Sequence, residues 1–149
     1  MEGVLVTPYE TFHDLLVRLF RDIISIEERA LTAGEFHDVT TNDMHIIEAI
    51  GREGAKNMST VAKMLSVTVG TLTIAINALV KKGYVNRERS EKDRRVVLIS
   101  NTEKGQRAFD HHAKFHDDMI KALLGGLSEE ESRIMVQAFT NLKDFFAKY

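Results

Sequence analysis

Apolar residues recur every three to four positions along most of this chain, and that spacing is typical of amphipathic helices. Only between residues 84 and 100 does the pattern change to the alternation that is typical of β-strands. The expected fold is therefore mainly α with a minor β part, consisting of six helices and one β-hairpin. The helices are expected over about 8–32, from Thr40 or Thr41 to near Gly51 and Gly54, and over about 59–65, 68–82, 102–124 and 128–149. Capping boxes are expected at Thr7 with Glu10 before the first helix and at Ser128 with Glu131 before the last.

The stretch 59–82 predicts two helices joined by a tight turn, which is a helix-turn-helix. Ser59 is the expected N-cap of the first helix and Thr68 that of the second, because a hydroxyl oxygen accepts a hydrogen bond from an otherwise unpaired N–H group at a helix start. Residues 66–68 form the expected turn.

The second of these helices has two different faces. One face is apolar and predicts burial, and it consists of Leu72, Ile76, Leu79 and Val80. The other face is small, hydrogen-bonding and finally cationic, and it consists of Gly70, Thr71, Thr73, Asn77 and Lys81. Such a face suits a helix in the DNA major groove, where short polar side chains contact base edges and lysine contacts phosphate. Ordinary packing between helices is the alternative interpretation.

A charged hairpin follows the helix-turn-helix directly. Residues 84–89 predict one strand, 90–93 a polar turn and 94–100 a second strand. Residues 81–95 contain seven Lys or Arg and three acids, a net charge of +4, whereas the whole chain carries −2. A basic segment on an acidic chain favours contact with a polyanion. The alternative is a hairpin whose charges only prevent its exposed edge from pairing with another strand.

This arrangement resembles the MarR family of winged-helix regulators. The resemblance rests on the hairpin tip Asp93-x-Arg95, the strand after it and the sequence Thr102-x-x-Gly105, and it extends over essentially the whole chain. It implies a single MarR-type chain over 1–149, with a DNA-binding lobe at about 40–101 and dimerisation helices at about 8–32 and 102–149. One difference is Ser66, which stands where the family often has glycine.

The resemblance also implies roles for the hairpin residues. One arginine enters the DNA minor groove while Asp93 orients the other, and we assign Arg94 to the groove and Arg95 to the pair. The expected DNA contacts are Ser59, Thr68, Gly70, Thr71, Thr73, Asn77, Lys81, Arg89, Asp93, Arg94 and Arg95.

Four segments resemble, within the family, the repressors of fatty-acid synthesis genes: 44–48, 67–73, 89–97 and 115–119. This resemblance implies a repressor whose corepressor is an acyl chain carried on acyl carrier protein. Because carrier protein is acidic, its docking surface should be basic, and Arg107, Lys114 and Lys121 are the candidates. The alternative is a regulator that a small apolar or phenolic ligand releases from DNA.

The long terminal helices carry more apolar surface than one small winged-helix core needs, and such surface usually marks an interface. We therefore expect an obligate two-fold homodimer through the first, fifth and sixth helices. Its recognition helices would lie roughly 34 Å apart, which requires palindromic DNA. An effector pocket is expected between the interface and the DNA-binding lobe, although core packing is the alternative for each residue. Its candidates are Phe20, Ile23, Ile24, Met44, Ile47, Phe109 and Met119.

Three histidines are close in sequence, His111, His112 and His116, and the last two are one helical turn apart. That spacing can hold a divalent metal, but surface or interface positions are the preferred interpretation, and no metal or cofactor is expected. His45 is expected to be a hydrogen-bonded core residue or a gate to the ligand pocket.

Several classes of protein are disfavoured. No nucleotide-binding glycine motif or nucleophile elbow is present, and the chain has no cysteine, so an enzyme is not expected. The acids Glu27, Glu28 and Glu129–Glu131 are interpreted as solvated helix surface and caps. With 149 residues, no signal-peptide pattern and no long apolar run, the chain is expected to be one cytoplasmic domain. A winged helix that serves only as a protein adaptor would not need a basic hairpin.

Overall fold

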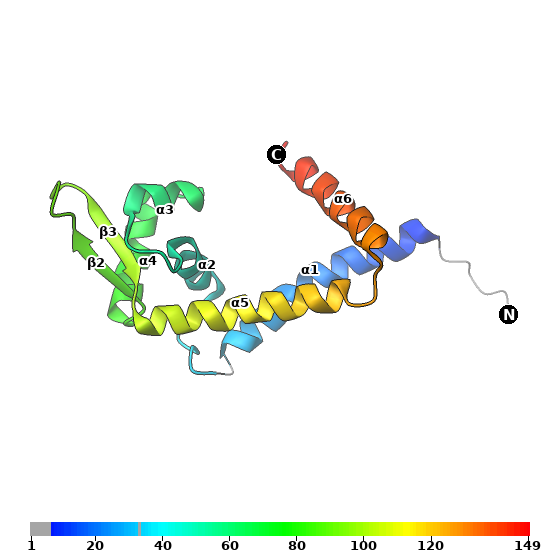
Figure 1. Ribbon diagram of the computed structural model, residues 1–149, viewed down its shortest axis with the longest axis horizontal. Helices are drawn as coiled ribbons and strands as arrows, with labels where there is room; N and C mark the ends of the chain where they lie inside the picture. The colour runs from blue at the N-terminus through cyan, green and yellow to red at the C-terminus, as the bar shows by residue number, and fades with distance from the viewer. Residues whose placement is uncertain (1–6, 33) are drawn as a thin grey trace. The chain divides into compact units, whose positions relative to one another are not determined.

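The computed structural model describes residues 7–32 and 34–149. These residues form six helices and one small sheet, which confirms the mainly helical class (Figure 1). The elements are α1 (Pro8–Thr32), α2 (Thr41–Ile50), β1 (Lys56–Asn57), α3 (Met58–Met64), α4 (Val69–Lys81), β2 (Val85–Arg89), β3 (Val97–Asn101), α5 (Glu103–Leu124) and α6 (Glu129–Phe146).

The sheet has three antiparallel strands in the order β1-β3-β2. Ile99 of β3 pairs with Arg87 of β2 on one side and with Lys56 of β1 on the other. The sequence did not indicate β1, because a strand of two residues is too short to show alternation. The second hairpin strand begins at Val97 rather than at Arg94, so both arginines of the tip lie in the turn.

Most helix ends are where the sequence predicts them. Thr7 and Glu10 form a capping box at the start of α1, with N–H···O distances of 2.9 and 3.2 Å. A second box joins Ser128 and Glu131 before α6. The N-cap of α2 is Thr40, the first of the two threonines that the sequence offers there.

The core of the winged-helix lobe comes from α2, α3, α4 and the sheet. Met44, Ile47 and Ile50 of α2 are fully buried, as are the inward side chains of α4. Tyr84 and Ile99 close this core from the sheet side. At about 1.5–3 kcal/mol for each large apolar side chain, this burial is the main stabilising contribution.

The chain divides into two compact units, residues 1–112 and 113–149, and α5 contributes to both. In the second unit, α6 has no buried residue, and Ile134, Val136 and Phe139 are each at least half exposed.

No single helix within 7–32 and 34–149 is long and apolar enough to cross a membrane. The helices α3 and α4, which are bent by 106° relative to each other, pass the length and composition test only as a pair.

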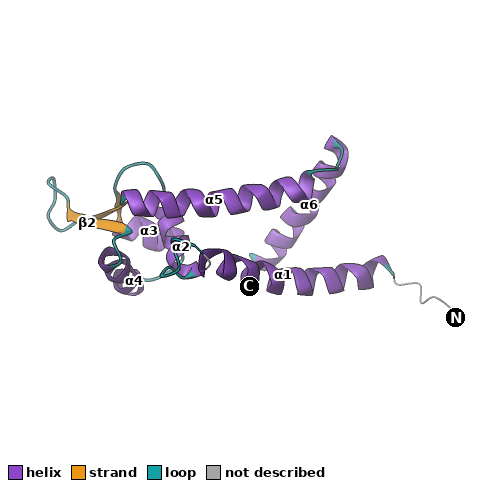
Figure 2. Cartoon of the chain, turned by 90° about the horizontal axis from the view of Figure 1, so that it is seen from below, coloured by secondary structure: helices purple, strands orange, loops and turns teal. Residues whose placement is uncertain are grey.

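Figure 2 shows the strand segments beside α3 and α4.

Candidate nucleic-acid interface

The N-cap of α3 is Asn57, and this corrects the sequence prediction for Ser59. The Asn57 side chain accepts a hydrogen bond from the Ser59 backbone N–H at 2.8 Å, so Ser59 lies inside the helix. Asn is as good an N-cap as Ser, and the pattern alone did not distinguish two candidates two positions apart. The Ser59 side chain is exposed at the first turn of α3.

This difference leads to a prediction for stability. Asn57→Ala should lower the free energy of unfolding by about 1 kcal/mol, because it leaves a helix-start N–H unpaired. Ser59→Ala should change it by less than about 0.5 kcal/mol, because its hydroxyl has no capping role. Urea denaturation of both variants measures the difference, and an equal loss in both would contradict the assignment of Asn57.

The turn between α3 and α4 holds the two helices at a fixed angle. Ser66 adopts a left-handed backbone with φ of 54°, which L-residues other than Gly and Asn adopt at a cost. The Val67 N–H donates to the carbonyl of Ala62 at 3.0 Å, and Ala62 is buried where α4 approaches. Glycine is common at such a turn because it adopts φ > 0 without strain. Ser66 adopts the same backbone conformation at a cost that glycine would avoid.

Thr68 caps α4, as predicted. Its hydroxyl accepts from the Thr71 N–H at 3.1 Å, and the hydroxyl oxygens of the two threonines are 2.9 Å apart. This pair therefore fixes the first turn of α4 and holds the Thr71 hydroxyl at the helix surface.

The two faces of α4 divide largely as the sequence predicts. Leu72, Ile76 and Leu79 are buried, while Val80 is 39% exposed and so lies at the edge of the apolar face rather than inside it. The exposed face contains Gly70, Thr71, Asn77 and Lys81.

Thr73 differs from its prediction. Its side chain is half-buried, and its hydroxyl donates to the Val69 carbonyl at 2.7 Å. Its contact with DNA stays a prediction, because its hydroxyl proton is used within the helix and Thr73 lies about 100° away from the centre of the outward face. The centre of the outward face is occupied by Ile74, which is 75% exposed. The sequence did not indicate this residue, because an apolar side chain gives no sign of contact with DNA.

Asn77 is linked to the hairpin. Its side-chain oxygen accepts a hydrogen bond from Arg87 of β2 at 2.8 Å. The amide NH2 group of Asn77 takes no part in this bond and is available for another partner. The bond also ties the outward face of α4 to the sheet.

The hairpin tip holds two arginines in different environments. Arg95 donates to the Asp93 carboxylate from its backbone N–H at 3.0 Å and from its guanidinium at 3.1 and 3.3 Å. These hydrogen bonds lower the pKa of Asp93 below its ordinary value, the side-chain bond being the larger cause. Arg94 is exposed and has no hydrogen bond or ion pair with any residue in the described part of the chain. The geometry therefore matches the assignment of Arg95 to the pair and leaves the Arg94 guanidinium unengaged.

The base of the hairpin is fixed by contacts that the sequence did not indicate. The Tyr84 hydroxyl donates to Asp38 at 2.5 Å, and the Lys104 ammonium lies 4.0 Å above the Tyr84 ring. The hydrogen bond from Tyr84 lowers the pKa of Asp38, and Lys104 at 3.6 Å contributes to that shift. Burial, together with the bond to Asp38, raises the pKa of the Tyr84 hydroxyl.

Tyr84→Phe should therefore destabilise the protein in a pH-dependent way. Asp38 has a lowered folded-state pKa, so its stabilising effect is present above its ordinary pKa of about 3.9 and is lost as the pH falls below it. Because Asp38 is about one-third exposed, solvent screens the bond, and we expect a loss of about 1 kcal/mol near neutral pH. Urea denaturation near pH 7 and near pH 3 should show the difference between the variant and the wild type shrinking in acid. Tyr9→Phe is the matched control, since Tyr9 is 79% exposed; a cost of Tyr84→Phe that does not change with pH would contradict this account.

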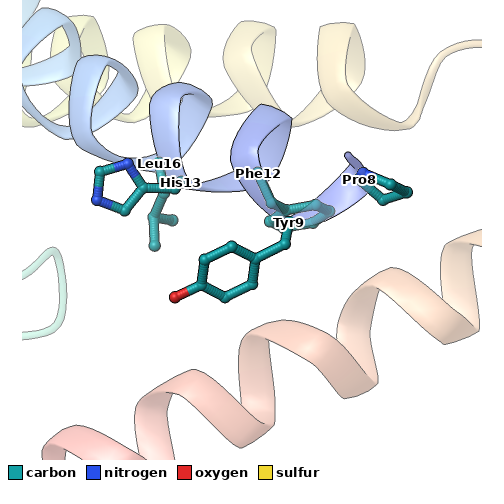
Figure 3. A pocket seen from close by; sticks show the side chains of 5 residues that line it. All are labelled: Pro8, Tyr9, Phe12, His13 and Leu16. Carbon is teal, nitrogen blue, oxygen red and sulfur yellow. The ribbon is translucent and has the colours of Figure 1, made fainter. Parts of the chain in front are cut away.

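The residues predicted for an effector pocket lie in different environments. Met44 and Ile47 are fully buried in the lobe core, whereas Phe20 and Ile24 are about half exposed on α1. Ile23 and Phe109 are half-buried, and Met119 belongs to the second unit. Met44 and Ile47 thus belong to the core cluster, and their role in an effector pocket stays a prediction. The structure instead has a shallow apolar hollow lined by Pro8, Tyr9, Phe12, His13 and Leu16, all on α1 (Figure 3).

The three basic candidates for a carrier-protein surface each pair with an acid. Such pairing reduces the net positive charge that an acidic partner would meet. The pairs are Arg107–Glu35 at 2.8 Å, Lys114–Asp118 and Lys121–Asp117.

The histidines are not equivalent. His112 is 2% exposed, and its Nε2 lies 3.0 Å from Glu27 and 3.5 Å from Glu48. Glu27 is thus buried, and its interpretation as solvated surface was wrong. The residues around Glu27 in the sequence cannot show that His112 of α5 packs against it. His45 is exposed, so its predicted core position was also wrong: the inward face of α2 is formed by its neighbours.

His111 lies on the surface, with its ring 5.6 Å from that of Phe36. His116 belongs to the second unit, where its ring lies 5.7 Å from that of Phe115.

Comparison with known proteins gives consistent matches. The family described as transcriptional regulator SarA/Rot matches residues 33–112, more than half of the chain. The structure of Streptococcus pneumoniae FabT in complex with DNA is 38% identical, with a TM-score of 0.85 over 94% of this chain and 98% of that one. The transcriptional regulator YpoP of Bacillus subtilis is 25% identical over 105 residues, or 70% of this chain and 74% of its own length.

A MarR/EmrR family regulator from Acinetobacter has the same fold, with a TM-score of 0.67 at 16% identity over 97% of this chain and all of that one. These relatives are transcriptional regulators, not enzymes. The chain therefore belongs to the MarR family of winged-helix, DNA-binding transcriptional regulators.

Proposed function

We propose that this chain is a homodimeric repressor of fatty-acid biosynthesis genes, that it binds a palindromic operator, and that acyl-acyl-carrier-protein is its corepressor. The observation that carries the proposal is the 38% identity to FabT, whose structure was solved with DNA, over nearly the whole chain. Two of the segments that resemble fatty-acid-synthesis repressors, 67–73 and 89–97, lie on α4 and the hairpin tip.

In this proposal the exposed face of α4 enters the major groove and the hairpin tip contacts the minor groove. Thr71, Asn77 and Lys81 are exposed along α4, and Arg94 is exposed at the tip. Ser59, Thr68 and Arg89 are also exposed and act on the phosphate backbone, which positions the protein without reading sequence.

The homodimer is supported by apolar surface on the terminal helices. On α1, Tyr9, Phe12 and Leu15 are each more than 60% exposed, and on α6, Ile134 and Val136 are as well. Patches of this kind on a water-exposed helix usually mark an interface. Two-fold pairing gives two recognition helices one DNA turn apart and so requires a palindrome.

Fluorescence anisotropy with labelled promoter DNA from fatty-acid biosynthesis genes tests the proposal. Acyl-loaded carrier protein should raise the affinity for that DNA, with an optimum at one range of chain lengths, because a corepressor binds the DNA-competent conformation more tightly. Carrier protein without an acyl chain is the control. Unchanged affinity at every chain length would contradict the corepressor, and absence of sequence preference would contradict the repressor.

The apolar hollow on α1 supports a second candidate, a small apolar or phenolic ligand that releases the protein from DNA. The same assay separates the two, since such a ligand lowers rather than raises the affinity. Leu16→Gln, at the wall of the hollow, should then abolish the response to the ligand, and light scattering should show that the variant is still a dimer.

A further inference from the structure

Ile74 is the most exposed large apolar side chain on α4, at 75%. We infer that it lies against the 5-methyl group of a thymine in the major groove and sets the base preference at one position of each half-site. The inference rests on the proposed binding of α4 to DNA and specifies what that helix recognises.

Ile74 lies at the centre of the outward face of α4. Gly70 comes one helical turn before it and Ala78 one turn after it, and both are exposed. A Cβ at Gly70 would meet only the Thr68 hydroxyl, at 3.8 Å, so the space beside the helix there is open. With a small residue on each side, the Ile74 side chain protrudes farther than its neighbours along this row.

The apolar character of Ile74 is not explained by the protein core. The inward side chains Leu72, Ile76 and Leu79 already fill that side of α4 and are at most 1% exposed. The surroundings of Ile74 are instead polar and basic, with Lys81 on the same face and a net charge of +4 over 81–95. These polar and basic surroundings complement a polyanion. The expected partner of Ile74 is therefore the edge of a DNA base rather than an apolar protein surface.

Thymine is the base whose major-groove edge presents a methyl group, next to the O4 acceptor. Asn77 lies one turn from Ile74, at a spacing that brings the two side chains together on the helix surface. The Asn77 oxygen already accepts from Arg87, so the NH2 group is the part of this side chain that has no bond to the hairpin. An apolar group and a donor side by side match the methyl group and the O4 atom of thymine. Adenine fits less well, because its bidentate recognition by Asn uses both the oxygen and the NH2 group.

The test uses a duplex that the full-length protein enriches from a randomised pool. Each thymine is replaced in turn by deoxyuridine, which removes only the methyl group. For the wild type we expect an affinity loss of about fourfold per methyl group at one thymine of each half-site. Ile74→Ala should abolish the loss at that position and leave sensitivity to uridine at other positions unchanged.

Val80→Ala is the matched control, because Val80 is an exposed apolar residue of α4 that lies off the outward face. It should retain the wild-type uridine profile. Thermal unfolding should show that both variants fold, since each changes an exposed side chain.

A wild type with no uridine-sensitive position, or an Ile74→Ala profile identical to that of the wild type, would overturn the inference and leave the proposed function standing. Failure of the protein to enrich any duplex would overturn both.

Discussion

Arg94→Ala should weaken operator binding by about 100- to 1,000-fold. A well-placed arginine contact contributes about 1–3 kcal/mol, and at about 1.5–2 kcal/mol each the two contacts of a dimer contribute about 3–4 kcal/mol. Arg94 is available for this contact because it is exposed and has no partner among the residues described in the structure. The loss of one charge per subunit should also lower the slope of log affinity against log salt by about 2. Anisotropy at several salt concentrations measures both effects.

The matched control neutralises the neighbouring ion pair. In the double variant Asp93→Asn with Arg95→Gln, one charge of each sign is removed and a hydrogen-bonding pair is kept, so the salt slope should remain as in the wild type. Dimer mass by light scattering should be unchanged in both proteins. A larger loss of affinity in the double variant than in Arg94→Ala would show that Arg95 is the groove arginine instead.

Gly105→Ala should destabilise the fold by about 3 kcal/mol, near the upper end for overpacking. A Cβ at this position would lie 2.2 Å from the carbonyl oxygen of Tyr84, whereas carbon–oxygen contacts lie at about 3.3 Å or more. That oxygen cannot move away freely, because it accepts the hydrogen bond of the Thr102 N–H at 2.9 Å. The start of α5 must therefore shift, and with it the base of the hairpin.

Thermal unfolding at a fixed protomer concentration should show a Tm lower by about 10 °C. Gly126→Ala is the matched control, since a Cβ there meets no atom within 4 Å, and its Tm should change by no more than about 2 °C. A Gly105→Ala protein as stable as this control would contradict the close approach of α5 to Tyr84.

The helices could be predicted because their signals are local. A cap is a contact between residues three positions apart, as in Thr7–Glu10 and Ser128–Glu131, and periodicity within one helix shows its apolar side. The one error of this kind, Ser59 for Asn57, moved a boundary by two residues.

The candidate DNA interface was predicted in outline but not side chain by side chain. Thr73 and Ile74 are neighbours in sequence, yet the first bonds back into its helix and the second points outward. Residue type suggested the opposite, because a hydroxyl group looks more suitable for DNA than an isoleucine. The rotation of α4 about its axis, fixed by the packing of Leu72, Ile76 and Leu79, decided between them.

The sequence by itself determined the order and type of every element except β1, the basic hairpin and the family, because periodicity, caps and charge density need only neighbouring residues. The tertiary structure alone decided which side chains are partners across long separations, such as Tyr84 with Asp38, Asn77 with Arg87 and Glu27 with His112. These contacts depend on how the helices pack against one another and against the sheet. The spacing of residues along the sequence does not show that packing.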